Sequence, residues 1–126
     1  MIWSFKEDRP IYAQLIEHIE VAIISGSFKP GDKMPSVREL ASEAGVNPNT
    51  MQRALAELEQ NKLLYAQRTA GRYVTEDEDI IASVKKEIAL KHIEEFLYAM
   101  GRLGFNAKEA LKEAIETINN SEQKEG

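Results

Sequence analysis

Two helix-start patterns follow one another closely in this chain, with a glycine between them, and they constrain the fold more than any other feature. Ser36 and Glu39 form a capping box, in which the hydroxyl accepts from the residue-39 amide and the carboxylate reaches back, so a helix begins here. Gly45 suits the left-handed residue that ends a helix, and Asn47 followed by Pro48 supplies a new N-cap and first turn. Two helices joined by about three residues that include a glycine predict a helix-turn-helix motif.

The second helix of this motif, expected from Pro48 to Asn61, has one apolar and one polar face. At about 100 degrees per residue, Met51, Leu55 and Leu58 point inward. The outward-pointing residues are Asn49, Gln52, Arg53 and Ala56. The outward face is therefore polar, with one cation and no acid.

Elements on either side of the motif complete a small domain. Before it, apolar residues at spacings of three and four predict a helix over about residues 10–25, with Pro10 at its first position and Gly26 at its end. After it, residues 63–75 predict two short strands around a turn. A hairpin directly after a helix-turn-helix is a wing. The expected fold is therefore mainly α with a small β-hairpin, an N-terminal winged helix-turn-helix followed by a C-terminal two-helix tail.

The tail leaves apolar faces uncovered. A helix over about residues 77–101 has one apolar face early and another, rotated by about a quarter to a third of a turn, later. Asn106 and Glu109 form a capping box that opens a last helix, and residues 120–126 are expected to fray. A second copy of the chain could cover these faces in a two-fold dimer. The interface residues that we expect are Ile93, Phe96, Met100, Leu103, Leu111 and Ile115.

Charge is divided unevenly along the chain. Residues 1–75 hold nine basic and nine acidic side chains, whereas residues 76–126 hold seven and twelve, so the net charge of -5 lies entirely in the tail. We therefore expect two domains, a winged helix-turn-helix domain over 1–75 and a two-helix dimerisation domain over 76–126. The first domain can therefore carry a local basic surface, although the net charge of the whole chain is negative.

Composition argues against several other classes. The chain has no cysteine, and its two histidines, His18 and His92, are far apart in sequence, so we expect no metal site, no thiolate chemistry and no cofactor. It has no glycine-rich phosphate loop, nucleophile elbow or acid–base pair on one rigid element, so we do not expect an enzyme. No apolar run approaches the roughly 20 residues of a membrane span, and the start lacks the order of a signal peptide, so the expected location is the cytoplasm.

Several stretches of the chain carry a family resemblance. They are Pro10-Ile11-Tyr12, residues 26–41 (GSFKPGDKMPSVRELA), residues 45–50 (GVNPNT), Leu55 with Leu58-Glu59, Leu63-Leu64 and Gly71-Arg72-Tyr73-Val74. Together they resemble the DNA-binding domain of GntR-family bacterial transcription regulators, over roughly the first 75 residues. The Asn-Pro-Asn-Thr-x-Gln-Arg-Ala form of the second motif helix, with the short tail, resembles the YtrA subfamily, whose tail is a pair of dimerising helices.

This resemblance implies a dimeric, sequence-specific transcription regulator, a repressor that binds an inverted-repeat operator in double-stranded DNA. The family's DNA-contacting positions correspond here to Arg38, Asn47, Asn49, Thr50, Gln52 and the wing residues Arg68, Thr69, Ala70 and Gly71. The chain departs from the family at three places. Pro48 and Gln52 stand where many members have a basic residue and an arginine, and Thr69-Ala70-Gly71 replaces the usual Gly-x-Gly of the wing.

The chemistry of these side chains predicts the same DNA-binding surface independently of the family resemblance. Cations near the backbone neutralise phosphates, and the candidates for this role are Arg38, Arg53, Arg68 and Arg72. Asn49 and Gln52 carry forked groups that can pair with adenine edges in the major groove. The alternative is a winged-helix protein-interaction module without DNA binding, which the acidic net charge keeps open.

Overall fold

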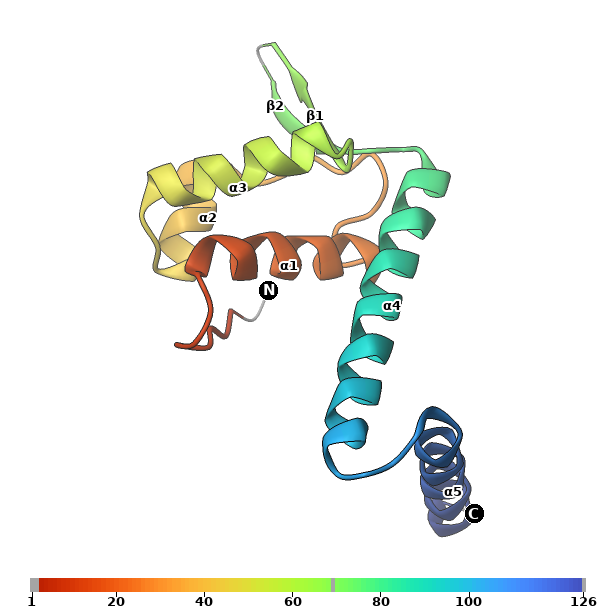
Figure 1. Ribbon diagram of the computed structural model, residues 1–126. Coiled ribbons are helices and arrows are strands. Elements are labelled where there is room, and N and C mark those ends of the chain that lie inside the picture. Colours follow the sequence, from red (N-terminus) through yellow and green to blue (C-terminus); the bar gives the residue numbers. More distant parts are fainter. Residues whose placement is uncertain (1–2, 69, 126) are drawn as a thin grey trace. The chain divides into compact units, whose positions relative to one another are not determined.

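The computed structural model describes residues 3–68 and 70–125, without the side chains of 124 and 125. It contains five helices and one antiparallel hairpin among these residues (Figure 1). The chain divides into two compact units, residues 1–86 and 87–126, and the boundary between them falls within a helix. The mainly α fold with a small β-hairpin is confirmed. The division of function at residue 75 stays a prediction.

Three helices build the first unit around one apolar core. They are α1 (Ile11–Ile24), α2 (Val37–Ala44) and α3 (Pro48–Gln60), and α3 packs against both of the others. Pro10 is the N-cap of α1 and not its first helical residue, because its ψ of 137° is extended. The largest fully buried side chains of this unit are Leu15, Ile19, Leu40, Met51, Leu55, Leu58, Leu63, Leu64 and Val74.

The ends of α2 and α3 follow the expected capping chemistry. The Ser36 hydroxyl accepts from the Glu39 amide at 3.1 Å and donates to the Glu39 carboxylate at 3.2 Å. The carboxylate thus reaches back to the hydroxyl. Gly45 ends α2 with a φ of 72°, a left-handed conformation that costs glycine little. The Asn47 side chain then accepts from the Asn49 amide at 2.7 Å and begins α3.

The hairpin consists of β1 (Leu64–Gln67) and β2 (Gly71–Val74), paired antiparallel. The α1–α2 connection lies along its second strand, because Lys33 forms a bridge with Tyr73 and the Met34 amide donates to the Arg72 carbonyl at 2.8 Å. These bonds tie the wing to the residues that lead into α2. The wing is therefore held beside the helix-turn-helix by backbone pairing as well as by buried side chains.

Two long helices follow the hairpin. Helix α4 spans Glu78–Arg102 and α5 spans Ala107–Glu125, so the stretch expected to fray is helical as far as residue 125. Asn106 and Glu109 form the predicted capping box, with the Asn106 amide donating to the carboxylate at 3.0 Å and the Glu109 amide donating to the carboxamide oxygen at 2.9 Å. None of the helices in the described part of the chain is long and apolar enough to span a bilayer.

Candidate nucleic-acid interface

The outward face of α3 is the centre of the candidate interface. Asn49, Gln52 and Arg53 are exposed there, and Ala56 continues the face toward the end of the helix. On the opposite side Met51 and Leu55 are at most 1% exposed, so the helix cannot rotate without uncovering the core. The buried face therefore fixes which side chains α3 presents to solvent.

Arg53 is held at the edge of this face that lies toward α1. Its guanidinium carbon lies 4.6 Å from the centre of the Tyr12 ring, a cation–π distance. The Tyr12 hydroxyl donates a hydrogen bond to the Glu57 carboxylate, and this bond is the main reason that the pKa of Tyr12 is raised above its usual value. Tyr12 and Glu57 therefore restrict where Arg53 can carry its charge.

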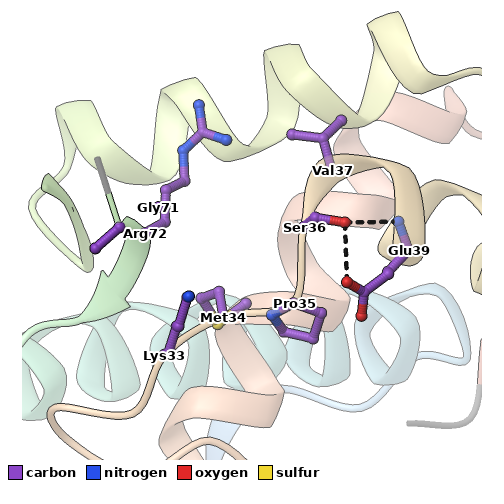
Figure 2. A pocket seen from close by; sticks show the side chains of 9 residues that line it. Lys33, Met34, Pro35, Ser36, Val37, Glu39, Gly71 and Arg72 are labelled. Atoms are coloured by element: carbon purple, nitrogen blue, oxygen red, sulfur yellow. Dashed lines mark hydrogen bonds between the residues drawn. The ribbon is translucent and has the colours of Figure 1, made fainter. Parts of the chain in front are cut away.

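Arg72 is held at the opposite edge, toward the wing. Its Nε donates to the Glu59 carboxylate, and its Nη1 lies 3.4 Å from the Gln52 Oε1. The Arg72 side chain extends from β2 toward α3 (Figure 2) and is 17% exposed. Arg72, one of the four cations predicted for the interface, is thus paired with a carboxylate of α3.

The remaining predicted residues surround this face. Arg38 is exposed in the first turn of α2, and Arg68 is exposed in the turn of the hairpin. Asn47 uses its side-chain oxygen to cap α3, and Thr50 is half-buried in the first turn of α3. Gly71 begins β2 with a φ of 92°. Thr69 lies outside the described residues.

A hollow of about 670 Å³ separates the N-terminus of α2 from the wing (Figure 2). Its lining includes the capping residues Ser36 and Glu39, the backbone of Gly71, and the cationic side chains Lys33 and Arg72. Sequence patterns did not single out Lys33 for this surface. Its position became visible only through the bridge between the α1–α2 connection and β2.

Three further residues of the interface were missed by sequence reasoning, namely Tyr12, Glu57 and Glu59. Glu57 stands four residues after Arg53, and side chains at this spacing are neighbours on a helix, so its place could have been found. The contacts of Tyr12 with Glu57 and of Glu59 with Arg72 join different elements, so the spacing of residues within one helix or strand cannot predict them. The face without acids is thus bordered by two carboxylates, each of which has a hydrogen-bond partner.

Residues 11–74 match the family model of bacterial regulatory proteins of the gntR family. The chain belongs to this family. It is 35% identical to the uncharacterized HTH-type transcriptional regulator YhcF of Bacillus subtilis, over 91% of this chain and 94% of that one. It is 42% identical to the HTH-type transcriptional repressor YtrA of the same organism, over 57% of this chain and 55% of that one. The family resemblance of the sequence, including the YtrA-like motif, is confirmed.

Solved structures of GntR proteins share the fold. A GntR family transcriptional regulator from Listeria monocytogenes superposes with a TM-score of 0.81 and 39% identity, over 89% of this chain and 98% of that one. The DNA-binding domain of AraR in complex with its operator ORX1 superposes with a TM-score of 0.52 and 32% identity, over 60% of this chain and 92% of that one. The chain is accordingly a winged helix-turn-helix transcription regulator.

Proposed function

We propose that this GntR-family regulator represses transcription as a dimer that binds an inverted-repeat operator. The observation that carries the proposal is the exposed amide-bearing face of α3, rigidly oriented by the core and flanked by a wing. In this arrangement α3 enters the major groove and the hairpin reaches the flanking minor groove. The complex of the AraR DNA-binding domain with its operator supports this use of the winged domain.

The proposal gives the exposed residues two kinds of role. Asn49 and Gln52 contact base edges, because their exposed carboxamides can form hydrogen bonds with base edges in the major groove. Arg38, Arg53 and Arg68 neutralise phosphates, since each is exposed at the edge of α2, α3 or the wing. We also propose that Asn47, Thr50, Thr69 and Gly71 contact the DNA, Thr50 at a phosphate, and that Gly71 lets the protein backbone pass close to it.

Dimerisation through α4 and α5 is supported by their exposed apolar side chains. In an isolated chain Leu103 is 74% exposed and Leu111 is 59% exposed. Covering such side chains contributes about 25 cal/mol for each Å² of apolar surface removed from water. We propose the six residues expected from the sequence as the interface, and the exposed Leu97 and Ile118 extend the same apolar set.

The proposal describes a binding protein that performs no catalytic step and requires no cofactor. A regulator of this kind acts on chromosomal DNA, which places it in the bacterial cytoplasm. The protein-interaction alternative differs in one measurable property. A winged module without DNA binding has no salt-dependent affinity for duplex DNA, whereas a regulator loses affinity steadily as salt rises.

The test begins with selection of bound fragments from the source genome, followed by footprinting of the fragment that binds best. We expect two equal protected half-sites related by a two-fold axis. A footprint confined to one unrepeated half-site would contradict the dimeric operator complex. Absence of salt-dependent binding to any duplex would favour the protein-interaction module.

Arg38→Ala provides a matched test of the phosphate role. Removing one phosphate contact should weaken operator and scrambled duplexes alike and lower the salt slope by about 1. Lys85→Ala, which removes the same charge from an exposed position of α4, is the control. Equal effects of the two variants would mean that Arg38 acts only through the total charge.

A further inference from the structure

Three side chains connect the wing to the outward face of α3. Arg72 of β2 donates through Nε to the Glu59 carboxylate and through Nη1 to the Gln52 Oε1, the latter at 3.4 Å. Gln52 and Glu59 stand seven residues apart on α3, which is two helical turns, so they lie on one side of the helix. Arg72 therefore bridges two turns of the recognition helix from the neighbouring strand.

The strand register explains why Arg72 points toward α3. Arg72 is paired with Ala66, and it lies on the same face of the hairpin as Leu64 and Val74, which are buried. Tyr73 alternates to the other face, where its ring stacks on that of Tyr65 at a centroid distance of 5.7 Å. The Arg72 side chain is thus directed inward along α3, away from the outer surface of the wing.

The ion pair changes what Arg72 can contribute to DNA binding. Its side chain is 17% exposed and that of Glu59 is 31% exposed, so the pair is partly withdrawn from solvent. The charge of Arg72 is already balanced by Glu59. A balanced cation neutralises no additional phosphate and releases no additional counterion, so it adds little to the salt dependence of binding.

The same contact fixes the orientation of the Gln52 carboxamide. A guanidinium only donates hydrogen bonds, so the atom of Gln52 that faces it must be the oxygen. The Gln52 NH₂ group is then the part left to point away from Arg72. An amide held in this way offers donors to a base edge, and its oxygen is engaged within the protein.

We propose that Arg72 is a positioning residue, held by Glu59, that orients Gln52 to donate to a base edge carrying acceptors. Guanine presents two acceptors in the major groove, O6 and N7, whereas adenine presents an acceptor and a donor. Gln52 therefore selects guanine over adenine at the position it contacts, and the wing determines that choice without touching the base. This inference rests on the proposed DNA-binding function and assigns to Arg72 a role other than phosphate neutralisation.

The test uses the whole chain, residues 1–126, and an operator library with every single base-pair substitution. Arg72→Met keeps an unbranched side chain and removes the donors. We expect it to lose the guanine preference at one position of each half-site and to weaken operator binding roughly 5- to 150-fold, the range of one good base contact. Because Arg72→Met alone leaves the Glu59 charge unbalanced, the salt slope and the affinity for scrambled DNA are measured on Arg72→Met combined with Glu59→Gln, where both should stay as in the wild type.

Three variants serve as matched controls. Arg68→Ala removes an exposed wing cation and should lower the salt slope by about 1 on every duplex. Glu59→Gln should release the charge of Arg72, so it should steepen the slope and tighten binding to scrambled DNA. Circular dichroism and Arg72→Lys, which keeps a donor and the charge, separate loss of positioning from loss of the fold.

A double-mutant cycle tests whether Arg72 acts on the operator through Gln52. In a Gln52→Ala background, Arg72→Met should cause no further loss of operator affinity, because the group that it orients is gone. Additive losses would overturn the proposal, as would a drop of about 1 in the salt slope for Arg72→Met combined with Glu59→Gln. Both of these results would leave DNA binding by the wild type intact. If the wild type shows no salt-dependent DNA binding, the proposed function and this inference both fail.

Discussion

The two units of this protein treat their apolar residues in opposite ways. In the first unit Leu15, Met51 and Leu58 are 0% exposed, and their neighbours belong to other helices of the same chain. Among the described residues from 87 onward, Ala110 is the only buried one, while Leu103 is 74% exposed. One unit encloses its own core, whereas the other leaves most of its apolar surface to water.

The contrast follows from the number of elements in each unit. Three helices and a hairpin can surround a core, but one helix and the larger part of another cannot enclose the apolar faces that they carry. A helix is stabilised in water chiefly by burial of its apolar face. We therefore expect the first unit to fold by itself and the second to require a second copy of the chain.

The largest expected effect is on assembly. Replacing both Leu111 and Ile115 with glutamate places two charges in the apolar face of α5, where burial of unpaired charges is strongly unfavourable. Sedimentation at micromolar concentration should show a monomer, with the winged unit still cooperatively folded. Lys112→Glu, an exposed neighbour, should leave the dimer intact. If the double variant remains dimeric, the apolar face of α5 does not hold the dimer together, and the second unit does not depend on a second copy of the chain to cover it.

A truncation in the core tests the other side of the comparison. Leu55→Ala leaves a cavity beneath α3 and should lower the free energy of unfolding by about 2 to 5 kcal/mol, measured by urea denaturation. This loss should not depend on protein concentration. Leu111→Ala should instead have an effect that grows as the protein is diluted, because it acts through association. Equal concentration dependence for the two variants would count against independent folding of the first unit.

Helix caps should be of similar value in both units, because capping is local. Ser36→Ala removes the cap of α2 and Asn106→Ala removes that of α5, and each should cost about 0.5 to 2 kcal/mol. Ser42→Ala, at an exposed helical position, is the control and should change stability by no more than about 0.5 kcal/mol. A much larger loss for Asn106→Ala than for Ser36→Ala would indicate that α5 forms only when capped.

The smallest expected effect concerns the tyrosine beside Arg53. The bond to Glu57 raises the folded-state pKa of Tyr12 above its usual value of 10.0, so the folded chain holds this proton more tightly than the unfolded chain does. The associated stability is fully present below pH 10 and is lost as pH rises through the folded pKa. The stability difference between wild type and Tyr12→Phe should therefore shrink at alkaline pH in urea titrations.

Tyr98→Phe is the control for that measurement, since Tyr98 belongs to the second unit and is 71% exposed. The difference between Tyr98→Phe and wild type should not change over the same pH range. A pH-independent difference for Tyr12→Phe would instead mean that the contact with Glu57 does not contribute to the stability of the first unit.

Helix boundaries and faces were predictable because they depend on neighbours in the chain. Ser36, Gly45 and Asn47 act through bonds and dihedral angles that span at most a few residues, and they bound α2 and α3 as expected. The period of apolar residues likewise identified the outward face of α3. The position predicted for Pro10 was wrong by one residue: it is the N-cap of α1 and not the first helical residue, since a proline is tolerated on either side of a helix start.

The partners of the interface side chains were decided by tertiary packing. Tyr12 and Glu57 are 45 residues apart, and Glu59 and Arg72 are 13 apart, so only the packing of α1 and β2 against α3 brings them together. Arg72 looks in the sequence like any wing cation. Its inward direction is set by the register of β2 against β1, a pairing between strands that no helical or capping pattern encodes. Local sequence thus determined which residues α3 presents to solvent. Long-range contacts determined which charged side chains of the interface are paired within the protein.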